Sequence, residues 1–124
     1  MKRIFDEYIG RTNQDFLVEK EKSGEAMVFH CRGALSTLNT DSINELLKAV
    51  GAAGEKKVVL DLTNVVHIDS MGLGSIATAF KQASAAGAAF VVVAKPPLRD
   101  VLELASLHKF LTISDNLQVA LTAD

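Results

Sequence analysis

The chain contains few of the residues that cross-link or rigidify a small protein. It has one cysteine, two prolines and no tryptophan among 124 residues, and aromatic residues make up only 6%. The single cysteine, Cys31, excludes an intramolecular disulfide, and its strand-like setting favours a small buried side chain in a protein of a reducing compartment. Stability must therefore come from aliphatic packing. With 48% hydrophobic residues, we expect residues 1–124 to form one compact domain.

The chain also lacks a charge excess and a long apolar run. It has 13 Lys and Arg against 15 Asp and Glu, a formal net charge of −2, which gives no general attraction to nucleic acid or to anionic lipid. No run approaches the length of a membrane span, and the charged residues at positions 2, 3, 6 and 7 do not fit a secretion signal. We therefore expect a cytoplasmic protein with no membrane span and no direct contact with nucleic acid.

Hydrophobic periodicity predicts strands that alternate with helices. Residues 15–20 and 26–31 are β-compatible runs on either side of a turn, and the charged run 19–22 fits a solvated hairpin tip. Beyond the hairpin, the pattern predicts the following order: helix 40–53 with a capping box of Ser42 and Glu45, strand 58–62, helix 70–86, strand 88–94, a helix opened by Pro96-Pro97, edge strand 111–113 and a final helix capped by Asp115. The expected fold class is a single α/β domain with a mixed β-sheet, in which β-α-β alternation follows the hairpin and residues 1–14 form a less determined extension.

The most informative segment is 58–76, VVLDLTNVVHIDSMGLGSI, which leads from a buried strand to Ser70 at the start of a helix. Unpaired N–H groups and the helix dipole favour an anion at such a position, and a phosphate would add about two negative charges. Gly72 and Gly74 each cost about 1 kcal/mol of helix propensity relative to alanine, so they indicate a close approach of another backbone or of a partner. Ser70 is therefore a candidate phosphorylation switch, and the competing interpretation is an ordinary helix N-cap.

The same segment resembles the signature of the STAS domain, and in particular that of the anti-sigma-factor antagonists, in which a strand ending in Asp-Leu precedes Asp-Ser-x-Gly-Leu-Gly. The resemblance covers the chain from about Phe16 onward. It implies a non-enzymatic binding module whose motif serine, here Ser70, is phosphorylated by a kinase-like anti-sigma factor. The unphosphorylated form binds that kinase and frees the sigma factor, and an opposing serine phosphatase restores it. The residues implied in partner binding at the helix start are Asp69, Met71, Gly72, Leu73 and Gly74.

Two positions depart from the family pattern. Many members have a second Ser or Thr after the motif serine, whereas this chain has Met71. Upstream, Gly33-Ala34-Leu35-Ser36 stands where the family usually has Gly-x-Leu-Asp in a loop beside the serine, so Ser36 replaces an acid that would repel a phosphate. The resemblance adds Gly33, Leu35 and Ser36 to the expected partner-binding residues.

Two other functions remain open at this point. One keeps the fold but makes the chain a scaffold or accessory subunit of a larger assembly, in which Ser70 only caps a helix or acts as a slow modulator. The other is a small nucleotide-binding protein, because residues 72–77 fit the dinucleotide pattern G-x-G-x-x-A. Against it, about ten residues separate the expected strand from Gly72, and Lys95 stands where a ribose-binding acid is expected.

The remaining reactive side chains do not form a recognisable catalytic or metal site. His67, Asp69 and Ser70 have the residue types of a hydrolase triad, but their adjacency in sequence prevents the convergent geometry, and His67 fits a loop position. His30 and Cys31 would point to opposite faces of a strand, which gives no metal-ligand spacing. Asp61, at the end of an apolar strand, fits a structural acid bonded to nearby backbone amides. We therefore expect no metal, no cofactor and no catalytic residue.

Overall fold

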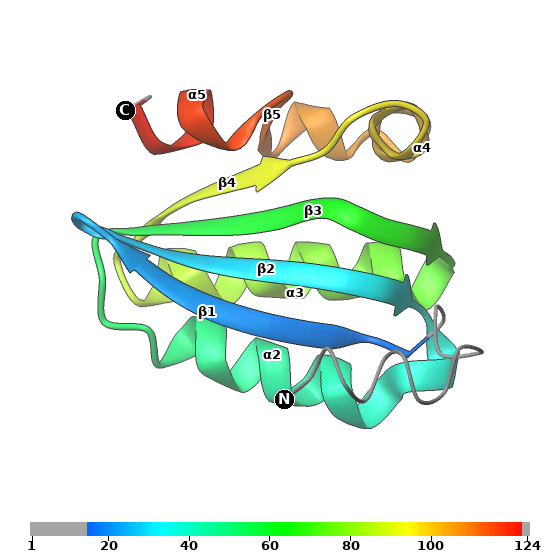
Figure 1. Ribbon diagram of the computed structural model, residues 1–124, viewed down its shortest axis with the longest axis horizontal. Helices are drawn as coiled ribbons and strands as arrows, with labels where there is room; N and C mark the ends of the chain where they lie inside the picture. Colours follow the sequence, from blue (N-terminus) through cyan, green and yellow to red (C-terminus); the bar gives the residue numbers. More distant parts are fainter. Residues whose placement is uncertain (1–14, 123–124) are drawn as a thin grey trace.

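The computed structural model describes residues 15–122, which form a mixed five-stranded sheet flanked by helices on both faces (Figure 1). The strands lie in the order β1-β2-β3-β4-β5; β1 and β2 are antiparallel and the other pairs are parallel. The elements are β1 (Leu17–Ser23), β2 (Ala26–Leu35), the 3-10 turn η2 (Thr37–Asn39), α2 (Thr40–Gly51), β3 (Lys57–Ile68), α3 (Ser70–Ala85), β4 (Ala89–Val93), α4 (Leu98–Leu104), the 3-10 turn η3 (Leu107–Lys109), β5 (Thr112–Ser114) and α5 (Leu117–Thr122). The expected hairpin, mixed sheet and β-α-β alternation are confirmed, while the extension 1–14 lies outside the described residues.

The core consists of two clusters, one on each face of the sheet. The larger cluster lies between the sheet and the neighbouring helices α2 and α3, and it contains Phe29, Cys31 and Leu60 (Figure 1). On the other face, Val28 and Val59 pack with α5. Adjacent residues of β2 and β3 thus enter opposite clusters, which is why these strands are apolar at consecutive positions.

Cys31 is buried as predicted, and burial raises the pKa of its thiol far above the ordinary value, so the thiolate does not form at neutral pH.

Strands β2 and β3 extend beyond the predicted ends. The prediction ended the strands at residues 31 and 62 and placed His67 in a loop, and this is wrong because β3 pairs with β2 as far as Ile68. The apolar run ends at residue 62 because Thr63, Asn64 and His67 are exposed, but exposed side chains do not interrupt the backbone pairing of a strand. The pairing passes through two register shifts, the second between Gly33 and Ala34.

Three predictions about caps and turns are wrong. Ser36, not Ser42, provides the cap near α2: its Oγ accepts a hydrogen bond from the Leu38 N–H at 3.2 Å, and η2 then continues into α2, so Ser42 lies inside the helix. Asn116 rather than Asp115 caps α5, accepting from the Val119 N–H at 2.8 Å. Asp115 instead forms an ion pair with Arg99 of α4. The charged run 19–22 is solvated as predicted, but it belongs to β1 rather than to the hairpin tip, and the turn follows it at Gly24, whose φ is +58°.

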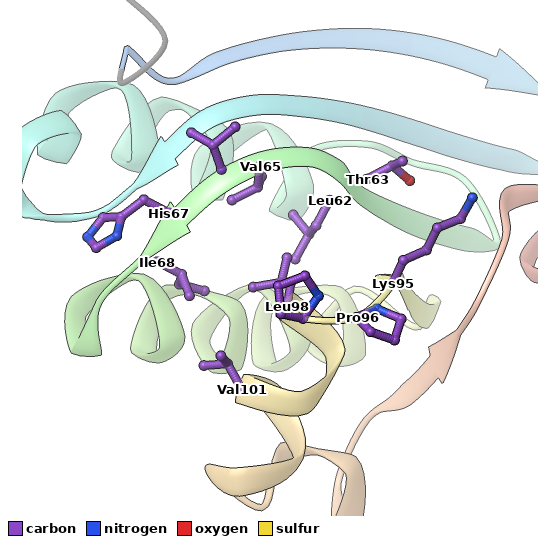
Figure 2. A pocket seen from close by; sticks show the side chains of 11 residues that line it. Leu62, Thr63, Val65, His67, Ile68, Lys95, Pro96, Leu98 and Val101 are labelled. Atoms are coloured by element: carbon purple, nitrogen blue, oxygen red, sulfur yellow. The ribbon is translucent and has the colours of Figure 1, made fainter.

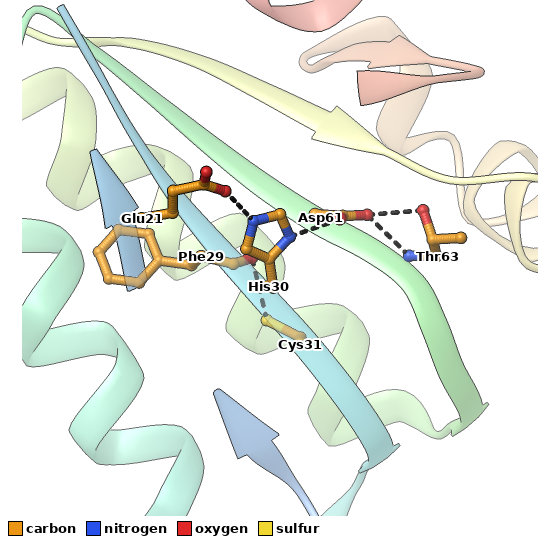
Figure 3. A network of polar contacts seen from close by, with 6 residues as sticks. All are labelled: Glu21, Phe29, His30, Cys31, Asp61 and Thr63. Carbon is orange, nitrogen blue, oxygen red and sulfur yellow. Dashed lines mark hydrogen bonds and ion pairs between the residues drawn. The ribbon is translucent and has the colours of Figure 1, made fainter. Parts of the chain in front are cut away.

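His30 joins the three N-terminal strands because it lies between two carboxylates (Figure 3). Its Nδ1 is 2.8 Å from Asp61 Oδ2 on β3, and its Nε2 is 2.8 Å from Glu21 Oε1 on β1. Because ionised carboxylates only accept hydrogen bonds, the imidazole must donate through both nitrogens and is protonated. Partial burial by itself would lower the pKa of His30, but the hydrogen bonds with Glu21 and Asp61 outweigh it and raise this pKa.

Asp61 is held in place from its other side by Thr63. Its Oδ1 accepts from the Thr63 N–H at 3.1 Å and from the Thr63 hydroxyl at 2.6 Å, which confirms the predicted structural role of this acid. Burial would raise the pKa of Asp61, but the hydrogen bonds from Thr63 and His30 outweigh it and lower this pKa. The ion pair therefore exists over a pH window bounded on the acid side by Asp61 and on the alkaline side by His30.

We expect the stabilisation by His30 to depend on pH. A raised histidine pKa contributes stability that is complete below the unfolded pKa of about 6.5 and is lost as pH rises through the folded pKa. The lowered pKa of Asp61 contributes stability that is complete above about pH 4 and is lost as pH falls through the folded value. Urea unfolding should show that His30→Gln lowers the free energy of unfolding by about 1 kcal/mol near pH 6, with the difference shrinking toward pH 9.

The matched control is His108→Gln, at an exposed histidine of η3. Its difference from the wild type should stay within about 0.5 kcal/mol at every pH, as for most surface substitutions. A difference for His30→Gln that stays constant from pH 6 to pH 9 would contradict the protonated bridge.

Candidate functional site

The site is the junction where β3 ends and α3 begins. Asp69 has an extended backbone (φ −119°, ψ −173°), and its Oδ1 accepts a hydrogen bond from the Gly72 N–H at 2.9 Å, so Asp69 is the N-cap of α3. Ser70 is the first helical residue and is exposed. The alternative that Ser70 is the N-cap is therefore wrong. Within residues 15–122 no group forms a hydrogen bond with the Ser70 hydroxyl, which leaves this oxygen open to solvent.

The second carboxylate oxygen of Asp69 connects α3 to the turn after β2. Oδ2 accepts from the Thr37 N–H at 3.0 Å and from the Thr37 hydroxyl at 3.2 Å. Hydrogen bonds from the Thr37 and Gly72 amides lower the pKa of Asp69, with a smaller contribution from the neighbouring His67. An ionised and fixed carboxylate thus lies directly beside Ser70. The sequence prediction missed Thr37, since a contact between residues 37 and 69 has no local signal.

Gly72 allows the backbones of α3 and β2 to come into contact. The Leu35 carbonyl accepts from the Asp69 N–H at 3.4 Å, and a Cβ on Gly72 would lie only 1.9 Å from the same carbonyl oxygen. Gly74, one residue further, is exposed, and nothing among the described residues lies within 4 Å of the position where its Cβ would be. The predicted close approach is therefore confirmed at Gly72 with the chain's own backbone, while Gly74 leaves open space on the surface.

The expected partner-binding residues fall into a surface group and a buried group. Gly74 is exposed, as is the candidate phosphorylation residue Ser70, and Asp69, Met71 and Leu73 are half-buried. The other four are buried and support the junction from inside: Gly33, Leu35, Ser36 and Gly72. Leu35 lies in the core and Ser36 caps η2, so neither side chain is available to a partner.

One surface residue of the region was missed by the sequence prediction. Leu38, in η2, is 71% exposed and follows Thr37, the residue that binds the Asp69 carboxylate. The only sequence signal was an apolar residue between a strand and a helix. A single exposed apolar side chain is common on protein surfaces, so Leu38 adds to the surface around the junction without by itself marking a contact.

Comparison with known proteins identifies the family. The sequence profile of the STAS domain matches residues 18–120. The chain belongs to the STAS domain family. Its fold is similar to that of an anti-sigma factor antagonist from Mycobacterium paratuberculosis, with 26% identity, a TM-score of 0.80, and coverage of 87% of this chain and 92% of that one.

Two further solved structures share the STAS fold. A putative anti-sigma factor antagonist from Thermotoga maritima is 24% identical with a TM-score of 0.72, over 84% of this chain and 91% of that one. The Bacillus cell fate determinant SpoIIAA in its phosphorylated form is 16% identical with a TM-score of 0.58, over 82% of this chain and 92% of that one. At these identities the two likenesses bear on the fold alone.

The site geometry disfavours a nucleotide. In a dinucleotide-binding turn the glycines let the pyrophosphate approach the backbone, but here the Gly72 Cα faces the Leu35 carbonyl oxygen, a hydrogen-bond acceptor. The hydrolase arrangement also fails, since within residues 15–122 His67 forms no hydrogen bond with Asp69 or with Ser70. Between residues 15 and 122 no cluster of three His, Cys, Asp or Glu could hold a metal ion. The same part of the chain contains no helix that is long and apolar enough to cross a bilayer.

We expect the two glycines of α3 to respond oppositely to substitution. Gly72→Ala should lower the free energy of unfolding by about 1–3 kcal/mol, because its Cβ would overlap the Leu35 carbonyl. Gly74→Ala is the matched control, and should be neutral or stabilising by up to about 1 kcal/mol, because it improves helix propensity in open space. Urea unfolding followed by circular dichroism measures both. Equal stability of the two variants would show that the helix start does not depend on this contact.

Proposed function

We propose that this chain is a non-enzymatic, phosphorylation-controlled protein-binding module of the anti-sigma-factor antagonist type. In its unmodified form it binds a kinase-like anti-sigma factor through the surface around Ser70, and phosphorylation of Ser70 ends that binding. An opposing serine phosphatase restores the binding form. The module would thereby act in transcriptional regulation in the cytoplasm.

The observation that carries the proposal is the exposed Ser70 hydroxyl beside an ionised, immobile Asp69. The hydroxyl has no structural role among the described residues, because Asp69 caps the helix in its place. A kinase can therefore modify Ser70 without breaking a bond that holds the fold. Because Asp69 caps α3, the alternative of a scaffold subunit in which Ser70 serves only as a helix cap is also removed.

The charge of a phosphate explains how the two states would differ. Phosphorylation adds about −1.5 to −2 charges next to the Asp69 carboxylate, on a surface that otherwise presents Gly74 and the half-buried Met71 and Leu73. The positive end of the α3 dipole partly stabilises the phosphate in the free protein. A partner that covers the site must remove water from the dianion, and this cost opposes binding. A differential affinity of about 3 kcal/mol would lower binding roughly 150-fold.

The relatives support this assignment. The Mycobacterium paratuberculosis protein, 26% identical over most of both chains, is an anti-sigma factor antagonist. SpoIIAA has been solved in an unphosphorylated form and in a phosphorylated form. In SpoIIAA the same fold accommodates both the unphosphorylated and the phosphorylated state. This is consistent with a Ser70 hydroxyl that forms no hydrogen bond within the described residues of this chain.

Calorimetry with a candidate kinase-like anti-sigma factor tests the proposal. Wild type and Ser70→Ala should bind with affinities within about threefold of each other, because the hydroxyl is not needed for the fold. Ser70→Asp should bind at least tenfold more weakly, which corresponds to about 1.4 kcal/mol, because it places a second carboxylate beside Asp69. With ATP and the same partner, mass spectrometry should find one phosphate, on Ser70.

The matched control is Ser42→Asp, which introduces the same charge at an exposed serine in the first turn of α2. It should bind like the wild type. Equal binding by Ser70→Ala and Ser70→Asp, or equal loss with Ser42→Asp and Ser70→Asp, would refute control at Ser70 and leave a STAS domain with another role.

A further inference from the structure

A groove lies between the second half of β3 and the start of α4 (Figure 2). Its volume is about 450 Å³, and its apolar lining comes from Leu62, Val65 and Ile68 of β3 and from Leu98 and Val101 of α4. Small-molecule sites commonly measure about 300–1,000 Å³, and α/β folds bind ligands beyond the carboxyl ends of parallel strands. The groove meets both criteria, because the connection from β4 to α4 forms one of its sides.

The charge of the lining has one sign. Lys95 and His67 are the titratable residues of the lining, and no carboxylate of residues 15–122 lines the groove even though the chain has a net charge of −2. In Figure 2 the Lys95 side chain runs outward at the Thr63 end, with its ammonium at the mouth of the groove, and the His67 ring points away from the groove at the opposite end. No carboxylate between residues 15 and 122 forms an ion pair with Lys95. The Thr63 hydroxyl at the same end donates a hydrogen bond to Asp61, and Lys95 is the cationic side chain of the lining there.

The side of the groove next to Lys95 is apolar, like the lining from β3 and α4. Pro96 and Pro97 line the groove and have no N–H groups, so this wall demands no hydrogen bonds from an occupant. At the rim, Val66 is 65% exposed and Val101 is 36% exposed. A ligand with a hydrocarbon chain would remove this apolar surface from water, and an anionic head group would match Lys95.

We propose that the groove binds a fatty-acid-like monocarboxylate as a single molecule. Its carboxylate forms an ion pair with Lys95, and its chain lies between β3 and α4 over Leu62, Val65 and Leu98. The groove adjoins the Ser70 surface at His67 and Ile68, but its lining includes none of the expected partner-binding residues. Binding there can be tested on the isolated protein, and its failure would leave the proposed function untouched.

Decanoate is the probe, titrated into the full-length protein below its micelle concentration and followed by two-dimensional amide NMR. We expect saturable shifts confined to residues 62–68 and 95–101. Lys95→Gln should weaken binding about tenfold, because a hydrogen-bonded charge pair is lost. The matched control Lys81→Gln, at an exposed lysine of α3, should leave the affinity unchanged. Decanol, with the same chain and no charge, should bind wild type and Lys95→Gln equally and about tenfold more weakly than decanoate binds wild type.

Three results would overturn the assignment. They are the absence of saturable decanoate shifts, shifts confined to other parts of the molecule, and equal affinities for Lys95→Gln and Lys81→Gln. If decanoate does not bind while a protein partner shifts the groove residues, the groove is a protein-docking surface instead. Both lysine substitutions replace one surface side chain by a shorter polar one, and circular dichroism should confirm that each variant is folded.

Discussion

The structure depends on the backbone contact between Leu35 and Gly72. The Leu35 carbonyl at the end of β2 accepts from the Asp69 N–H and leaves no room for a side chain on Gly72. This contact fixes the start of α3 against the sheet, and the Asp69 carboxylate then ties the same helix to Thr37. All of these bonds surround Ser70 and none uses its side chain. The junction is therefore held at the positions that define the shape of the surface, while the Ser70 hydroxyl takes part in none of these bonds.

The two hydrogen-bonded acids of β3 and α3 differ in how their charge is compensated. Asp61 lies against protonated His30, so its negative charge is balanced inside an ion pair on the sheet. Asp69 is held mainly by neutral N–H donors and a hydroxyl, and His67 adds a weaker attraction. Neutral donors stabilise a carboxylate but do not cancel its charge at a distance. A second negative group beside Asp69 therefore meets net repulsion, whereas one beside Asp61 would meet the field of His30.

The sequence predicted the elements and the position of Ser70 at a helix start, but not the contacts that build the junction. The alternation of apolar runs was enough for the hairpin, the parallel strands and the helix at residue 70, since burial on both faces leaves a continuous pattern. The caps were misassigned to Ser42 and Asp115 because several Ser, Asp and Asn residues precede each helix, and only the geometry of the preceding turn selects Ser36 and Asn116. Thr37 binds Asp69 across 32 positions, a pairing that no local rule can find.

The two glycines show why a neutral surface suits a phosphorylation switch. Gly72 is required by the fold, but Gly74 costs helix propensity and touches nothing within 4 Å of its missing Cβ in the described part of the chain. A surface without side chains lets a partner come close to the helix backbone, so binding depends on shape and on apolar neighbours such as Leu73. Such an interface has few charges of its own to offset a dianion. Under the proposed function, a single phosphate on Ser70 would therefore change a large fraction of the binding free energy, whereas in an interface built from many ion pairs its effect would be a smaller fraction.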